Sequence, residues 1–246
     1  MTALIYILQE NQACVAMDTL SLTSDDGKPL VFTSKMFPMP HLNGLICGTG
    51  VLNFVSNWVE NVRSQFVVKD MEHLSMFTVD PIRKLWQDFH FNGQQTSTIY
   101  YFGYSKYSLR LKGYAFRSTN NFNKEELQYS IGIKPQVTNM ELNNIPDDII
   151  RIMRDQKEQD DQLPLGQRLG IGGEIHLAVI TQNQVNIFNI HTFEDYDSCF
   201  HQMCERLLRF PDQSGPPFRS KLGQVSGLNW ASITEQSGPP LKPVIK

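Results

Sequence analysis

The sequence predicts a layered α+β fold, and the grouping of its periodic segments is the reason. Short apolar runs typical of strands open the chain, helical spacing follows, and then come strands, a helix, strands and a last helix. Strands that follow one another in groups favour antiparallel sheets, because a parallel sheet alternates strands with helices. With 246 residues and a hydrophobic share of 41%, the chain can bury a sizeable core without disulfides.

The first predicted elements are strands. Residues 3–8 and 13–17 are apolar runs joined by four polar residues, which predicts a hairpin with both strands largely buried. Three further extended segments, 30–33, 35–40 and 45–47, are separated by turn residues.

Helices follow these strands. From Val51 to Val62 the apolar residues recur at steps of three and four, which is helical spacing. Residues 70–77 and 80–89 are predicted as two more helices. Asp80 followed by Pro81 predicts that the second of these begins with Asp80 as its N-cap.

The second half of the chain repeats the strand and helix patterns. The predicted strands are residues 99–104, 109–115, 175–181 and 185–190, and the predicted helices are 146–159, exposed and amphipathic, and 195–208. No element is predicted for the polar segment 117–128. Gly-Pro-Pro occurs twice after Phe210, so we expect one domain over residues 1–210 and a C-terminal tail or arm over 211–246.

Composition argues against several classes of partner. The net charge of −3 gives no electrostatic reason to expect nucleic acid or an anionic membrane. No apolar stretch is long enough for a signal peptide or a membrane helix, and no cysteines form a CxxC pair, so a reduced cytoplasmic protein is expected. The histidines lack metal-ligand spacing and Gly170–Gly173 lacks a following Lys-Ser/Thr, so neither metal nor cofactor is expected. His176 and His191 are expected on strand faces rather than in catalysis.

Four stretches carry a resemblance to a known family. They are Thr2-Ala-Leu-Ile-Tyr6, Val15-Ala-Met-Asp18-Thr19, Ser34-Lys35-Met36 and Leu45-Ile-Cys-Gly48-Thr-Gly50. In order and spacing they resemble the active-site half of a proteasome β-type subunit, an N-terminal-nucleophile (Ntn) hydrolase. The run from Gly172 to Thr181 is similar to the Gly-Gly strand in that family's C-terminal half. The resemblance implies a four-layer αββα sandwich.

The resemblance also implies roles for four residues. Thr2 would be the nucleophile once Met1 is removed, Asp18 would hold Lys35, and the Gly48 N–H would form an oxyanion hole. The chemistry agrees, because a free α-amino group has a pKa near 7.7–8.0 and can act as base for the weakly nucleophilic Thr2 hydroxyl. The implied reaction is cleavage of a peptide or amide bond through an acyl-enzyme.

Two departures from the family pattern keep a second hypothesis open. Ile171 and Arg168 stand where active members carry Ser and Asp, and Ser118 and Ser130 are weak stand-ins for the family's central serines. The chain is therefore either a divergent threonine hydrolase or a catalytically lapsed subunit with a structural role.

Assembly and specificity are the last expectations. The resemblance implies a homo-oligomer joined through helices near 51–62 and 195–208, and the sequence makes no prediction of an ATPase partner. By position in that family, the residues of the substrate pocket would be Phe37, Cys47, Thr49 and Asn53. Phe37 and Cys47 suggest that the pocket is apolar, with core positions as the alternative for both.

Overall fold

The computed structural model describes residues 2–23, 26–91, 95–138 and 140–208. The chain divides into two compact units, Met1–Cys204 and Glu205–Lys246. The first unit is described here. The predicted tail over 211–246 lies outside the described residues.

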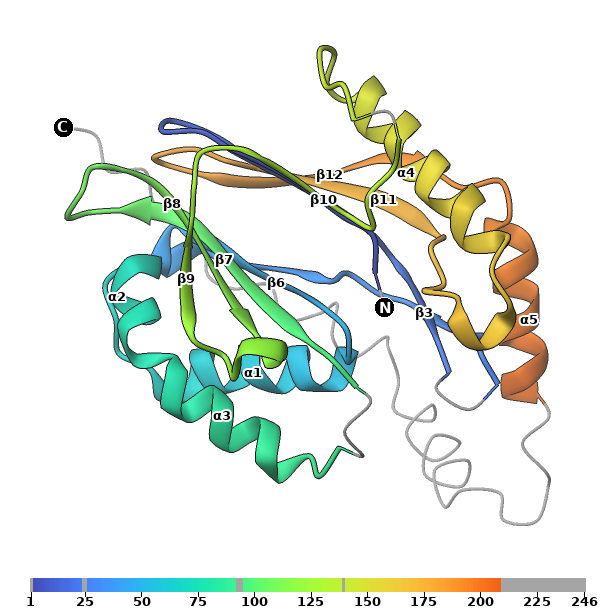
Figure 1. The fold of residues 1–246 in the computed structure, drawn as a ribbon, viewed down its shortest axis with the longest axis horizontal. Coiled ribbons are helices and arrows are strands. Elements are labelled where there is room, and N and C mark those ends of the chain that lie inside the picture. Colours follow the sequence, from blue (N-terminus) through green and yellow to red (C-terminus); the bar gives the residue numbers. More distant parts are fainter. Residues whose placement is uncertain (1, 24–25, 92–94, 139, 209–246) are drawn as a thin grey trace, which may run out of the picture. The chain divides into compact units, whose positions relative to one another are not determined.

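Two five-stranded sheets form the centre of the first unit (Figure 1). The first sheet has the order β10 (Ile131–Lys134), β1 (Leu4–Leu8), β2 (Ala13–Asp18), β11 (Glu174–Ile180) and β12 (Val185–Thr192). The second has the order β5 (Met36–Met39), β6 (Gly44–Thr49), β7 (Thr98–Ser105), β8 (Arg110–Arg117) and β9 (Lys124–Leu127). A separate ribbon pairs β3 (Leu20–Leu22) with β4 (Pro29–Phe32). Neighbouring strands are antiparallel throughout, which confirms the α+β prediction.

The two sheets pack against each other through alternate residues of their strands. Leu4, Val15 and Ala178 of the first sheet share one buried cluster with Leu45 and Phe102 of the second. Side chains alternate between the two faces of a strand, so the intervening residues face outward. The hairpin β1–β2 is therefore buried on both faces, as its unbroken apolar runs predict.

Helices cover the outer faces of both sheets. The second sheet carries α1 (Leu52–Gln65), α2 (Met71–Phe77) and α3 (Val79–Asp88), which pack on Ile46, Tyr101 and Phe116. The first sheet carries α4 (Asp147–Asp161), which packs on Ile5 and Ala16. The helix α5 (Tyr196–Leu208) packs Cys199 and Met203 on Leu20. Three single turns of 3-10 helix complete the described elements: η1 (Pro40–Leu42), η2 (Ser118–Asn120) and η3 (Leu165–Gln167).

The predicted start of α3 was wrong. The helix begins at Val79 with Thr78 as its N-cap residue, so Asp80 lies in the first turn. Thr78 is itself helical and fully buried, and its hydroxyl donates to the carbonyl of Leu74 in α2. Because α2 leads directly into α3 through Thr78, no capping position is left for Asp80.

The strands β9 and β10 were not predicted from the sequence. Both are edge strands with mostly half-exposed or exposed residues, so they lack a strong apolar alternation. In β9 the pairing depends partly on charge, since Arg117 Nε lies 2.8 Å from Glu125 Oε2. The exposure predicted for α4 holds for one side only, because Ile149, Ile152 and Met153 are buried against the first sheet.

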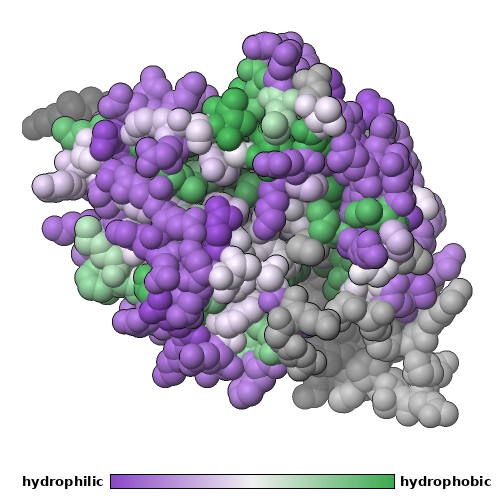
Figure 2. All heavy atoms as spheres, viewed as in Figure 1, coloured by the Kyte–Doolittle hydropathy of each residue, from purple (hydrophilic) through white to green (hydrophobic). Residues whose placement is uncertain are grey.

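The surface gives two further observations. Hydrophilic residues cover most of the face in Figure 2, and hydrophobic residues form smaller groups between them. Among the described residues, no helix combines the length and apolar character needed to cross a membrane.

Candidate functional site

A buried ion pair lies at the centre of the candidate site. Asp18 ends β2 and Lys35 directly precedes β5, and Lys35 Nζ lies 2.9 Å from Asp18 Oδ2. The Asp18 side chain is completely buried and that of Lys35 is 4% exposed. Lys35 Nζ also donates to the Leu20 carbonyl at 2.6 Å. The sequence-based pairing of these two residues is present in the structure.

Asp18 connects three segments that are distant in sequence. Its Oδ1 accepts the Ala3 N–H at 2.9 Å, and its Oδ2 accepts the Gly172 N–H at 3.4 Å in addition to Lys35. A buried carboxylate must be paired and hydrogen-bonded to be tolerated, and Asp18 meets both conditions. The start of β1, the lysine and the turn before β11 are thus held around one side chain.

The Gly172-Gly173 turn fits against the end of β2 because it lacks side chains. The Gly172 carbonyl accepts the N–H groups of Thr19 and Leu20, at 3.3 and 3.0 Å. Gly173 has a φ of +79°, and a Cβ there would lie 2.4 Å from Thr19 Oγ1. Glycine is therefore required for this turn to approach Asp18 so closely.

Burial shifts the pKa values of both charged partners toward neutrality. Desolvation lowers the pKa of Lys35, against the attraction of Asp18 that raises it. Desolvation likewise raises the pKa of Asp18, against the Lys35 charge and the N–H groups of Ala3 and Gly172 that lower it. Each group depends on the other to remain charged.

Thr2 lies at the start of β1, one residue before the N–H that Asp18 accepts. Its side chain is 5% exposed. Within the described part of the chain, Lys35 Nζ donates to Asp18 and Leu20, whereas an ammonium group has three N–H donors. Asp18 binds both Lys35 and the residue after Thr2, so Thr2, Asp18 and Lys35 belong to one local arrangement.

Gly48 lies on β6 beside this arrangement. The register of β5 and β6 pairs Met36 with Cys47, so Lys35 and Gly48 are the next residues on the two strands. A Cβ on Gly48 would lie 2.6 Å from Val55 Cγ2 and 3.2 Å from the Thr98 carbonyl oxygen. The close packing of α1 is thus sufficient to explain why glycine occupies this position.

The two departures from the family pattern have structural roles here. Ile171 is 2% exposed and packs in the cluster beneath α4 with Ala3 and Ala16. Arg168 donates to the carbonyls of Leu163 and Asp161, at 2.7 and 2.6 Å, and so binds the C-terminal end of α4. Neither side chain contacts Asp18 or Lys35 through any described hydrogen bond.

Asp160 is a residue of this site that the sequence did not reveal. It lies near the end of α4, is 3% exposed, and accepts the N–H groups of Leu169, Gly170 and Ile171 at 2.6, 2.8 and 3.3 Å. These bonds fix the turn whose next residue, Gly172, binds Asp18. Asp160 supports the site by accepting hydrogen bonds from backbone N–H groups. No sequence motif predicts a contact between a side chain and the backbone of a later turn.

Lys134 is a second residue that was missed. It ends β10, where it pairs in register with Leu4, and its Nζ donates to Thr49 Oγ1 at 3.2 Å. Thr49 directly follows Gly48, so a second ammonium group is bound next to Gly48 along β6. Because β10 was not predicted, nothing in the sequence indicated that Lys134 lies near Gly48.

The remaining sequence candidates lie elsewhere. Cys47 is completely buried between the sheets, which makes it a core residue, and burial strongly raises its thiol pKa. Phe37 packs on the opposite side of the second sheet, in the cluster beneath α1–α3, so the pocket interpretation of these two residues was wrong. His176 bonds to Glu174 on a strand face, as expected.

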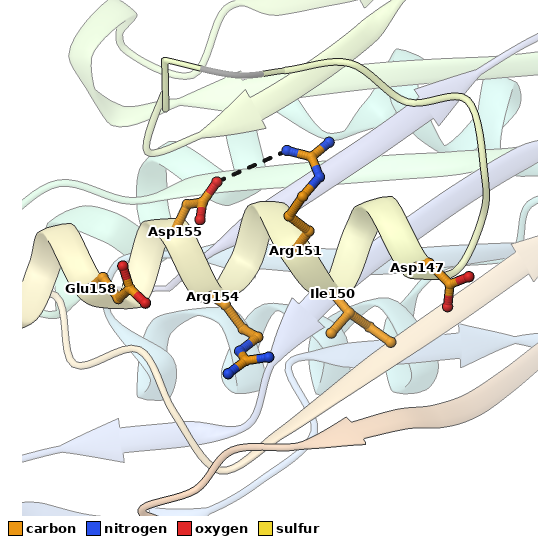
Figure 3. Close-up of a pocket in the computed structure, with 6 residues that line it drawn as sticks. All are labelled: Asp147, Ile150, Arg151, Arg154, Asp155 and Glu158. Carbon is orange, nitrogen blue, oxygen red and sulfur yellow. Dashed lines mark ion pairs between the residues drawn. The ribbon is translucent and has the colours of Figure 1, made fainter.

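A surface hollow on α4 is separate from the site. Its volume is about 370 Å³, and an Arg151–Asp155 ion pair spans 3.9 Å within it (Figure 3). All six residues that line it belong to one helix: Asp147, Ile150, Arg151, Arg154, Asp155 and Glu158. It shares no residue with the Asp18–Lys35 arrangement, so it is not assigned to the chemistry.

Comparison with solved structures finds a similar fold in a protein of known structure. A similar structure is the Gly-1 mutant of Anbu from Hyphomicrobium sp. strain MC1, a bacterial proteasome-like protein. The sequences are 12% identical, the TM-score is 0.58, and the match covers 88% of this chain and 100% of that chain. A likeness at this identity shows the fold. No family model matches the sequence, and no curated protein matches it.

Proposed function

We propose that this chain is a proteasome-like N-terminal threonine hydrolase with a four-layer αββα sandwich, active once Met1 has been removed. The observation that carries the proposal is Asp18, whose two oxygens bind both Lys35 and the N–H of the residue after Thr2. The fold shared with Anbu supports the same class.

The proposed reaction uses groups of this chain alone. The Thr2 α-amino group takes the proton from the Thr2 hydroxyl, whose oxygen attacks the carbonyl carbon of a peptide or amide. The remaining N–H of the Lys35 ammonium stabilises the Thr2 oxygen, and the Gly48 N–H stabilises the oxyanion. The amine then returns the proton to the leaving nitrogen, which leaves an ester on Thr2. Water hydrolyses this ester, and the threonine hydroxyl is restored.

Covalent labelling tests this proposal. The intact mass of the purified chain should show that Met1 is absent, and a β-lactone probe should then add once per chain, at Thr2. Thr2→Ala should abolish the adduct, whereas Thr2→Ser should retain it. A peptide and amide library, screened with wild type beside Thr2→Ala, identifies the substrate. Retention of Met1 on every molecule would remove the base and exclude the mechanism.

A lapsed subunit with an assembly role is the second candidate. It is favoured by Ile171, an apolar core residue where active members of the family carry Ser. This candidate predicts a folded chain that gives no adduct at Thr2, whether Met1 is retained or removed. Stoichiometric labelling that depends on Thr2 rules it out.

We also propose that the chain forms homo-oligomers through its outer helices. The helix α1 points its apolar residues inward and exposes Asn53 and Glu60, so a contact through this surface would be polar. Light scattering across micromolar concentrations is the measurement. A constant mass near 28.2 kDa, that of one chain, contradicts the proposal.

A further inference from the structure

Lys134 has a hydrogen-bonding and charge environment unlike those of the cations around it. Its ammonium donates to the neutral hydroxyl of Thr49, which is 1% exposed, and no described carboxylate forms an ion pair with it. The nearby Lys35 and Arg117 are each neutralised, by Asp18 at 2.9 Å and Glu125 at 2.8 Å. Lys134 is thus the uncompensated charge among these three groups.

The position of Lys134 relates it to the scissile bond of the proposed reaction. Its register partner Leu4 faces the second sheet, and the Lys134 side chain crosses to that sheet to reach Thr49. Leu4 lies two residues after Thr2, and Thr49 is the residue after Gly48. Lys134 is therefore joined to the strand that follows Thr2 through its register with Leu4, and to the strand that carries Gly48 through its bond to Thr49.

The surroundings of Lys134 are unfavourable for an unpaired cation. Partial burial lowers its pKa, and repulsion by Arg117 lowers it further. Arg117 lies in the same row of the second sheet, since Thr98 pairs with both Arg117 and Thr49. A charged group without a counter-ion in a half-buried position gains most when an anion binds it.

We propose that Lys134 is a specificity-determining residue that binds a carboxylate of the substrate, in the side chain next to the scissile carbonyl. The substrate class is then a peptide with Asp or Glu at that position. This inference rests on the proposed function for its choice of ligand, but its test does not depend on turnover.

Binding to the full-length Thr2→Ala chain provides the test. Two peptides, acetyl-Ala-Ala-Asp-amide and acetyl-Ala-Ala-Asn-amide, differ by one carboxylate, and calorimetry measures the dissociation constant of each. The Asp peptide should bind about 10-fold or more tightly than the Asn peptide, as expected for one charge-assisted contact. Lys134→Met should remove this preference and leave the Asn peptide unchanged.

Lys106→Met is the matched control, because it removes the same charge from an exposed turn between β7 and β8. The Lys106→Met variant should still bind the Asp peptide more tightly than the Asn peptide. Equal dissociation constants for the two peptides, or no binding of either, overturn the inference.

Turnover separates this inference from the proposed function. If wild type hydrolyses peptides with no preference for Asp, the specificity role of Lys134 is contradicted and the proposed hydrolase function is supported. If the Asp peptide binds preferentially but wild type hydrolyses neither peptide, the hydrolase function is contradicted and the carboxylate-binding role of Lys134 is supported.

Discussion

The indole Nε1 of Trp58 donates a hydrogen bond of 2.7 Å to the Tyr101 hydroxyl, in the interior between α1 and the second sheet. Both residues are completely buried, and the same hydroxyl lies 3.0 Å from Thr78 Oγ1 at the junction of α2 and α3. One phenol oxygen thus connects all three helices of this layer to the sheet beneath them.

Tyr101→Phe should lower the free energy of unfolding by about 1–3 kcal/mol, because the Trp58 N–H is left buried without an acceptor. Urea denaturation measures the change. Tyr107→Phe, at a position that is 92% exposed, should have no effect and serves as the control. Equal stability of Tyr101→Phe and wild type would show that the phenol oxygen contributes nothing.

Lys35→Met should destabilise the chain by about 3–5 kcal/mol, since it leaves the Asp18 carboxylate buried without its cation. The double variant Asp18→Asn/Lys35→Met should recover part of this loss, because the uncompensated charge is removed. In an active enzyme, Lys35→Met and Lys35→Arg should each reduce hydrolysis, on the scale of about 10²–10⁴-fold for lost assistance to proton transfer. Full activity of Lys35→Met would exclude the proposed site.

Gly48→Ala should cost about 1–3 kcal/mol by overpacking, because the added methyl would lie 2.6 and 2.8 Å from the two Cγ atoms of Val55. Gly48→Ala/Val55→Ala should tolerate the methyl better than Gly48→Ala in a wild-type background. Since both variants retain the backbone N–H at position 48, any hydrolysis should recover with stability. A double variant that is stable but inactive would show that glycine is needed for more than packing.

Asp160→Asn should release part of the turn before β11, because an amide offers one acceptor oxygen where the two carboxylate oxygens accept three N–H groups. We expect a loss of about 1–3 kcal/mol and faster hydrogen exchange at Leu169, Gly170 and Ile171. Asp161→Asn is the neighbouring control, since the Asp161 side chain is 50% exposed and, among the described residues, forms one ion pair, with Lys157 at 3.1 Å. Unchanged exchange in Asp160→Asn would contradict the anchoring role.

Stability should decrease in acid partly through Glu72. Partial burial alone would raise its pKa, but bonds from Lys112 and Ser105 outweigh burial and lower the pKa. A lowered pKa means that the contribution is present above the unfolded value of about 4.3 and is lost as pH falls through the folded value. Unfolding at pH 3, 5 and 7 should show Lys112→Met less stable than wild type at pH 5 and 7, with a smaller difference at pH 3. A difference independent of pH would exclude this pair as the cause.

The sequence predicted those elements in which the pattern of apolar residues shows which faces are buried. The hairpin β1–β2 has unbroken apolar runs because both of its faces are buried, and α1 has periodic apolar residues because it buries one face. The Asp18–Lys35 pair was predicted by spacing within a family resemblance, and its two residues are in contact. The start of α3 was not predicted, since α2 leads directly into α3 through the buried Thr78 and leaves no capping position for Asp80.

The missed parts of the site share another cause. Asp160 acts on backbone N–H groups nine to eleven residues later, which leaves no periodic mark in the sequence. Lys134 lies on an edge strand whose exposed residues obscure the alternation, and its partner Thr49 is 85 residues away. Both contacts depend on tertiary structure: the first on the turn that follows α4, and the second on the packing of the two sheets.

The three groups bound to the Asp18 carboxylate are separated from it by 15, 17 and 154 residues along the chain. The last separation means that the arrangement is complete only after β11 has joined β2, one of the most non-local pairings in the chain and therefore one with a high loop-closure entropy. A nascent or partly folded polypeptide lacks the Gly172 contact that completes the cage around Asp18. In the proposed hydrolase, the environment that activates Thr2 would therefore form only in the completely folded chain. A partly folded chain would then be inactive.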